Sequence, residues 1–225
     1  MSDHILAIDA STTGCSVALF NGPETVFSIA SRVGRSSAEN LTLMMEQAVR
    51  LGGIGFPELA AVAVARGPGS YTGLRIAVST AKGLAMALNV PLISYGTLPA
   101  LCYHQEFTEG LDLLCPMIDA RRMEVFCGFY DAKYKTEVVP VEAVLVEKDS
   151  FFDILEQSRV LFLGEGSPKC RAVITHPNAR FATSVRPPSA EFAATLVWDK
   201  WQRKEWEDLV TFEPFYLKEY MFKTK

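Results

Sequence analysis

Ile8-Asp9-Ala10 closes an apolar run near the N-terminus, and Ile118-Asp119-Ala120 closes a second apolar run 110 positions later. With the same offset and no gap, apolar residues after the first run fall on apolar residues after the second. The pairs are Cys15 with Val125, Val17 with Cys127, Leu19 with Phe129, and Phe20 with Tyr130. A strand, a turn and another strand therefore occur twice, which indicates an internal duplication. Chance similarity between two short hairpins is the alternative.

The elements expected around the first copy follow the order β-β-β-α-β-α-β-α. Apolar runs bounded by turn residues predict strands over residues 5–8, 15–20, 24–30, 60–65 and 92–95. Helical spacing and stop signals predict helices over residues 38–51 and 74–88, and a third from about residue 97.

The second copy begins in the same way and continues less regularly. Strands are expected over residues 113–118, 124–130 and 160–163, with helices over 151–157 and 190–206. Two strand-strand-strand-helix-strand units suggest an α/β fold with a pair of ribonuclease-H-like domains, as in actin, Hsp70 and sugar kinases (the ASKHA fold). The expected domains are residues 1–105 and residues 106–225. The second is the smaller and less regular one, and it carries the C-terminal helix and an aromatic tail that should pack on the protein.

Composition and charge describe a folded protein that does not hold nucleic acid by itself. Of the 225 residues, 49% are hydrophobic and 21% are charged, and the net charge is −4 with a pI of about 5.5. Neutralising phosphates needs a basic face, so tRNA contact is expected only within a larger complex. Cysteines without a C-x-x-C pair, no signal sequence and no membrane-spanning run predict a cytoplasmic protein.

The turn after the first apolar run is a candidate nucleotide site. Hydroxyls and N–H groups at a hairpin tip can hold phosphate, and an Asp at the strand end can orient a metal-bound water. The alternative is a polar β-turn whose side chains cap the backbone, and the tip lacks a glycine that would ease phosphate approach. Together with a later glycine loop, the candidate cofactor-binding residues of this weak, vestigial cleft are Asp9, Ser11, Thr12, Thr13, Gly164 and Gly166.

A glycine-rich loop at residues 67–73 (G-P-G-S-Y-T-G) joins an expected strand to an expected helix. Anions bind at such helix N-termini. The loop is no dinucleotide fingerprint, because Thr72 replaces the third glycine, and no P-loop, because Leu74 follows Gly73. The residues alone favour a tight connection in which Ser70 or Thr72 caps the helix. The motif residues are Gly67, Gly69, Ser70, Tyr71, Thr72, Gly73 and Arg75.

Two expected helices, 38–51 and 74–88, carry more apolar surface than one core contact needs. Small residues at positions 77, 81 and 85 lie at i, i+4 and i+8, where another helix could approach closely. Interior packing is one explanation, and a subunit interface is the other. The candidate interface residues are Leu41, Met44, Met45, Leu74, Ala77, Val78, Ala81 and Ala85.

Motifs for metal binding and nucleophilic catalysis are not found in the sequence. The histidines His4, His104 and His176 lie far apart, and no G-x-S-x-G elbow occurs. We therefore expect no catalytic residue, no metal site and no tightly bound cofactor.

Three stretches together resemble the TsaB (YeaZ) family. They are residues 5–9 with 15–19, residues 67–76 with 83–85, and residues 118–121 with 124–125. The tail at residues 213–217 (E-P-F-Y-L) resembles the family's C-terminal pattern, so the resemblance spans nearly the whole chain. The run at 67–75 is its most specific part. The chain departs from many members at Ser37, where they carry a histidine, and this weakens any metal role.

The resemblance implies a non-catalytic accessory subunit. Family members pair with TsaD, a homologue that holds the metal and performs the transfer, and the ATPase TsaE joins them to form N6-threonylcarbamoyladenosine at position 37 of ANN-decoding tRNAs. The resemblance also implies self-association through the N-terminal helices, tRNA contact only within the complex, no membrane, and any ATP or ADP at an interface of the complex. The rival functions are an independent actin-fold ATPase or kinase and, less favoured, a glycoprotease-like peptidase.

Overall fold

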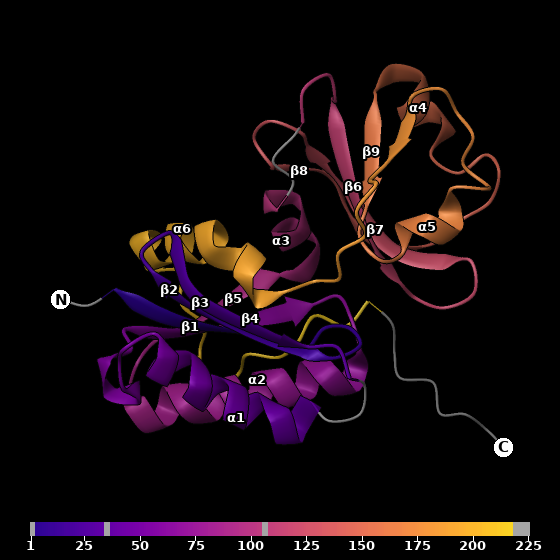
Figure 1. The fold of residues 1–225 in the computed structure, drawn as a ribbon. Coiled ribbons are helices and arrows are strands. Elements are labelled where there is room, and N and C mark those ends of the chain that lie inside the picture. The colour runs from indigo at the N-terminus through magenta and orange to yellow at the C-terminus, as the bar shows by residue number, and fades with distance from the viewer. Residues whose placement is uncertain (1–2, 34–36, 105–107, 218–225) are drawn as a thin grey trace, which may run out of the picture. The chain divides into compact units, whose positions relative to one another are not determined.

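The structure, a computed structural model, describes residues 3–33, 37–104 and 108–217, with the backbone alone at 37–39 (Figure 1). The side chain of Ser37 and the tail aromatics Tyr220 and Phe222 therefore lie outside the described residues. Contacts divide the chain into two units. The first unit is Met1–Ala100 with Pro188–Phe215, and the second is Leu101–Pro187 with Tyr216–Lys225.

The first unit is a mixed five-stranded sheet with helices on it. Its strands are β1 (His4–Asp9), β2 (Cys15–Asn21), β3 (Glu24–Ser31), β4 (Ala61–Gly67) and β5 (Leu92–Gly96), in the order β3-β2-β1-β4-β5. β1, β2 and β3 pair antiparallel, whereas β4 and β5 run parallel to β1. Its helices include α1 (Ser37–Leu51), η1 (Phe56–Glu58) and α2 (Tyr71–Leu88), and α3 (Thr97–Tyr103) begins in this unit and ends in the second. The order expected from sequence is confirmed. α1 and α2 lie side by side on one face of this sheet (Figure 1).

The second unit repeats the sheet of the first. Its elements are β6 (Leu113–Asp119), β7 (Glu124–Asp131), β8 (Glu137–Leu145), α4 (Phe152–Gln157), β9 (Val160–Leu163), α5 (Ser167–Cys170) and β10 (Ala179–Phe181). The strand order is β8-β7-β6-β9-β10, again with an antiparallel hairpin side and a parallel side. The matching order and directions support the duplication. No residue ranges were expected for β8 and β10, because Pro140 interrupts the first pattern and the second is only three residues long.

The gap-free offset of 110 is wrong by one residue. Asp9 pairs with Ser16 in the first hairpin, whereas Asp119 pairs with Val125 in the second, although a constant offset requires Phe126. The reason is the turn: residues 10–14 separate β1 from β2, and only residues 120–123 separate β6 from β7.

The expected boundary at residues 105 and 106 needs correction, because the C-terminal segment belongs to the first unit. It forms η2 (Ala190–Ala193) and α6 (Ala194–Arg203), which ends before residue 206. The Ala190 N–H donates to the Ser16 hydroxyl at 2.9 Å, and the Phe215 N–H donates to the Arg66 carbonyl at 2.7 Å. Groups of the first unit thus satisfy the backbone of this segment. Within the described residues, no helix is both long enough and apolar enough to cross a membrane.

Candidate functional site

Asp9, at the end of β1, is buried in the first hairpin with 3% of its surface exposed. Its Oδ1 accepts a hydrogen bond from the Ser11 N–H at 2.7 Å. Within the described part of the chain, Asp9 Oδ2 and the Ser11 hydroxyl are buried without a hydrogen-bond partner. Burial raises the pKa of the Asp9 carboxyl, more than hydrogen bonding from Ser11 lowers it. Burial therefore disfavours the ionised form of this carboxyl.

The glycine-rich loop at residues 67–73 closes over this hairpin. The Ser70 N–H donates to the Ser11 carbonyl at 2.6 Å. A Cβ on Gly69 would lie 2.1 Å from the Ser11 oxygen, and one on Gly73 would lie 2.0 Å from the Ala10 oxygen. These glycines are therefore required by backbone contact between the loop and the hairpin, not by an approaching phosphate.

Ser70 caps α2, and it is one of the two caps that the sequence predicted. Its hydroxyl accepts a hydrogen bond from the Gly73 N–H at 3.3 Å, satisfying one open donor of the helix. Tyr71 lies under the Arg75 guanidinium, with 4.3 Å between its ring centre and Arg75 Cζ. At the hairpin tip, Thr12 is half-buried and Thr13 is exposed. The motif loop thus joins hairpin and helix into one packed corner.

The second hairpin is held by a lysine. Asp119 Oδ1 accepts from the Arg121 N–H at 2.7 Å and from Lys169 Nζ at 2.6 Å. Lys169 Nζ also donates to the carbonyls of Arg122 at 2.8 Å and Glu124 at 2.6 Å. Desolvation alone would raise the pKa of Asp119, but the bonds from Lys169 and Arg121 outweigh it and lower the pKa. The sequence contained no signal for Lys169, because it lies 50 residues from Asp119.

Gly164 and Gly166 pack against β6. A Cβ on Gly164 would lie 2.6 Å from the Met117 oxygen, and one on Gly166 would lie 2.9 Å from the Ile118 carbonyl carbon. Close backbone packing explains both glycines. They belong to the second unit and the Asp9 hairpin to the first, so their pairing in one nucleotide cleft stays a prediction.

The interface residues expected on α1 and α2 are buried in the chain's own core, so they cannot form the partner surface directly. Each has at most 6% of its surface exposed. The residues concerned are Leu41, Met44, Met45, Leu74, Ala77, Val78, Ala81 and Ala85. Their spacing is explained by packing on the sheet, which takes the apolar face of each helix. The interior alternative stated with the prediction is therefore the correct one for these residues.

The outer face of α2 carries a different line of small residues. Ser79, Gly83 and Ala87 are exposed at i, i+4 and i+8, and a Cβ on Gly83 would meet no atom within 4 Å. Exposed apolar side chains lie beside this line: Met86 is 64% exposed, and Leu43 of α1 is 60% exposed. Both stripes recur every four residues, so spacing alone does not tell the buried stripe from the exposed one.

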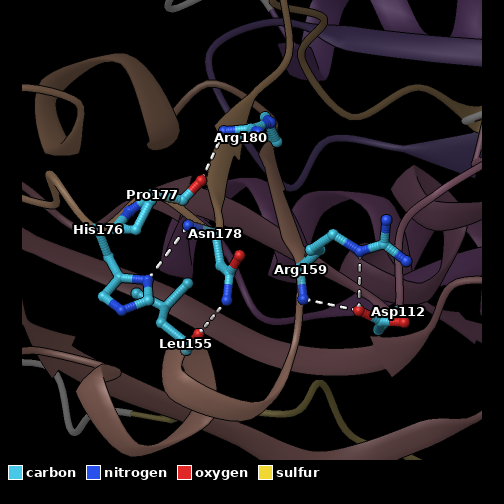
Figure 2. A network of polar contacts seen from close by, with 7 residues as sticks. All are labelled: Asp112, Leu155, Arg159, His176, Pro177, Asn178 and Arg180. Carbon is cyan, nitrogen blue, oxygen red and sulfur yellow. Dashed lines mark hydrogen bonds and ion pairs between the residues drawn. The ribbon is translucent and has the colours of Figure 1, made fainter.

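At the other end of the second sheet, polar groups tie the start of β9 to its neighbours. Figure 2 shows Arg159 against Asp112, whose Oδ2 accepts from the Arg159 N–H at 2.8 Å and from Nε at 3.4 Å. Asn178 donates through Nδ2 to the Leu155 carbonyl at 2.8 Å and through its N–H to His176 Nδ1 at 3.2 Å. Three of these four bonds join backbone to side chains, so we assign this cluster to structure.

Among the described residues, no three or more His, Cys, Asp or Glu side chains are arranged to hold a metal ion. Burial raises the pKa of the Cys102 and Cys115 thiols, with neighbouring thiols adding to the effect at Cys115. Such thiols behave as small core residues.

Comparison with known proteins gives the family. A family model described as "TsaD: tRNA N6-adenosine threonylcarbamoyltransferase" matches residues 29–219. The chain belongs to the TsaD family.

Curated relatives named "tRNA threonylcarbamoyladenosine biosynthesis protein TsaB" resemble about half of the chain. The Escherichia coli (strain K12) protein is 35% identical over 127 residues, covering 56% of this chain and 54% of that protein. The Bacillus subtilis (strain 168) protein is 40% identical over 110 residues, covering 48% and 47%.

Solved structures resemble the chain over nearly its full length. "YeaZ from Pseudomonas aeruginosa" is 27% identical with a TM-score of 0.79, and a protein described as similar to peptidase YEAZ, from the same organism, is 27% identical with a TM-score of 0.83. Each comparison covers 96% of this chain and 100% of the other. The TsaB (YeaZ) resemblance is thereby confirmed. In sequence, the chain spans about half the length of the curated relatives it matches.

Proposed function

We propose that this TsaD-family chain is a non-catalytic subunit of the machinery that forms threonylcarbamoyladenosine in ANN-decoding tRNAs. The observation that carries the proposal is the closed first hairpin. The carboxyl of Asp9 is buried with a raised pKa, and the loop at residues 67–73 packs backbone to backbone against the turn at Ala10 and Ser11. The names of the curated TsaB relatives indicate the pathway that we propose. The rival, an actin-fold ATPase, needs a hairpin that is open to its nucleotide.

On the same grounds, we propose a fold type and a cofactor requirement. The two sheets with equal strand order support a pair of ribonuclease-H-like domains of ASKHA type. No cofactor is tightly bound by the chain alone, and ATP or ADP binds, if at all, at an interface of the complex. The partners are a TsaD homologue and the ATPase TsaE, and the complex works in the cytoplasm.

The partner surface is the outer face of α1 and α2. Small residues there, with Gly83 at their centre, let a partner helix approach closely. Leu43 and Met86 supply apolar surface that water covers in the free chain. A TsaD homologue with two equivalent helices would complete a four-helix contact, and a second copy of this chain would use the same surface.

Reconstitution tests the catalytic assignment. The chain, a TsaD homologue from the same organism and TsaE are mixed with tRNA, threonylcarbamoyl donor and ATP, and the modified nucleoside is measured by chromatography and mass spectrometry. Product should require the chain, while the chain alone forms none and does not turn over ATP. Asp9→Asn should retain at least half of the stimulation. Loss of product in a folded Asp9→Asn variant would favour the enzymatic rival.

A single charged substitution tests the proposed partner surface on α1 and α2. Gly83→Glu should abolish binding to the TsaD homologue and self-association together, because an unpaired charge in a desolvated interface costs several kcal/mol. Gln202→Glu, on the exposed part of α6, adds the same charge elsewhere and should change neither. Ala81→Glu is unsuitable, because residue 81 is fully buried and the variant should unfold. Folded Gly83→Glu that binds normally would place the partner surface elsewhere.

A further inference from the structure

The tip of the second hairpin presents two arginines from a strained backbone. Arg121 and Arg122 both have positive φ, 74° and 50°, a region in which side chains other than Gly, Asn and Asp are uncommon. The hairpin is closed by backbone bonds from the Ala120 N–H to the Glu124 carbonyl and from the Glu124 N–H to the Arg121 carbonyl, both 3.0 Å. Glycine adopts such φ values without steric cost. Two exposed arginines at this position indicate a function that offsets the strain.

The charges of these arginines are left uncompensated. The acid of the turn, Asp119, is paired with Lys169 at 2.6 Å. In the part of the chain that the structure describes, neither the Arg121 nor the Arg122 guanidinium has a carboxylate ion-pair partner. By neutralising Asp119, Lys169 leaves both guanidinium groups available to an outside anion.

The hydrogen bonds from Lys169 also hold the turn in place. Lys169 binds one side chain and two carbonyls of the hairpin, which restrains its backbone. It lies at the edge where β6 and β9 end, and loops that follow the carboxyl ends of parallel strands commonly form binding sites. Arg171 follows α5 at this edge and is also exposed, with its Cζ 5.6 Å from the Phe181 ring centre. A further positive charge therefore accompanies the turn.

We infer that Arg121 and Arg122 bind backbone phosphates of RNA when the chain is part of its complex. Guanidinium groups match phosphate oxygens with paired hydrogen bonds, and two adjacent arginines suit successive phosphates. The inference rests on the proposed function, which supplies tRNA as the polyanion. It agrees with the net charge of −4, because two contacts add to a complex and do not make an independent RNA-binding protein.

Glycine replacements separate this role from a structural one. Arg121→Gly with Arg122→Gly removes both charges and relieves the backbone, since glycine adopts positive φ freely. The melting temperature should be unchanged or higher. In the reconstituted complex, binding of an unmodified ANN-decoding tRNA transcript should weaken about tenfold at physiological salt. The slope of log affinity against log salt should fall by about two, because each phosphate that is no longer neutralised lowers it by about one.

Matched variants complete the test. Arg121→Lys with Arg122→Lys keeps the charges and should keep most of the salt slope. Arg159→Gln removes an arginine at the opposite end of the same sheet, where Asp112 already neutralises it (Figure 2), and should leave tRNA affinity unchanged. Tripolyphosphate at millimolar concentration should not compete selectively with the tRNA in the wild type.

Other outcomes overturn the inference. Wild-type tRNA affinity and salt slope in the glycine variant would remove it while leaving the proposed function intact. Loss of TsaD binding with an unchanged salt slope would assign the turn to a protein partner. Arginine-dependent, selective competition by tripolyphosphate would assign it to a small anion. If the wild-type chain neither joins the complex nor supports product formation, the proposed function fails, and the inference fails with it.

Discussion

The hairpins after Asp9 and after Asp119 begin with the same hydrogen bond, from the N–H two residues later to the carboxylate, at 2.7 Å in each. Around this shared bond the two turns differ. A glycine loop covers Asp9, and burial raises its pKa, whereas Lys169 meets Asp119, whose side chain is 49% exposed and whose pKa is lowered.

This difference shows how a duplicated unit can diverge without changing its strands. In the first unit, the connection from β4 to α2 runs over the turn and contacts it backbone to backbone. In the second, the connection from β9 leads into α5, whose Lys169 contributes a charge to the turn. Asp9, Ala10 and Ser11 are therefore buried in the first turn, whereas Arg121 and Arg122 are exposed in the second.

The largest loss of stability should come from pushing the loop at residues 67–73 away from the first turn. Gly73→Ala places a Cβ about 2.0 Å from the Ala10 oxygen, so the loop must move, and we expect a loss of about 3 kcal/mol or more. Gly166→Ala, at 2.9 Å from a backbone carbon in the second unit, should cost less. Urea unfolding monitored by circular dichroism measures both. Equal losses would contradict the closer contact claimed for the first turn.

Asp9→Asn should stabilise the protein at neutral pH. The folded pKa is raised above 3.8, so the unfolded carboxyl loses its proton first, and the wild type loses stability as pH rises from about 4 through the folded pKa. Asn keeps an acceptor for the Ser11 N–H and carries no charge. The gain should be about 1.4 kcal/mol for each unit by which the pKa is raised. Thermal melts from pH 3.5 to 8 should show a difference that grows with pH; a constant difference would mean that Asp9 is not the titrating group.

Lys169→Met should have a smaller effect with the opposite pH dependence. The lowered pKa of Asp119 means that its contribution is present above 3.8 and is lost as pH falls through the folded pKa. Because Asp119 is half exposed, solvent screening limits the loss to about 1 kcal/mol. Chemical unfolding at pH 7 and pH 2.5 should show the gap closing in acid. A gap that persists there would come from the two carbonyl hydrogen bonds that methionine cannot make.

The smallest effect should appear at the tip of the second turn. Arg122→Gly relieves one positive-φ side chain and should add about 0.5 to 1 kcal/mol of stability at pH 7. Arg122→Ala, which keeps a Cβ, is the control and should add none. Differential scanning calorimetry measures the difference in stability between these two variants. Equal behaviour of the two variants would show that the turn is not strained.

Much of the fold could be predicted from the sequence. Apolar runs of strand length, turn residues after Asp9 and Asp119, and helix stops such as Gly52-Gly53 act over a few residues, so they mark local structure wherever the chain goes. For the same reason, the duplication was visible in outline and Ser70 could be named as a helix cap. The family resemblance came from such local runs as well.

Only the tertiary structure decided which surfaces are inside. Ala81 and Gly83 both belong to four-residue repeats, and the sheet beneath α2 buries one and exposes the other. The return of residues 188–215 to the first sheet and the bond from Lys169 to Asp119 join residues far apart in sequence, which periodicity does not record. Burial of Asp9 likewise depends on a loop that starts 58 positions later, at Gly67. Local free energies set the elements, and the packing of distant segments sets burial and charge at each site.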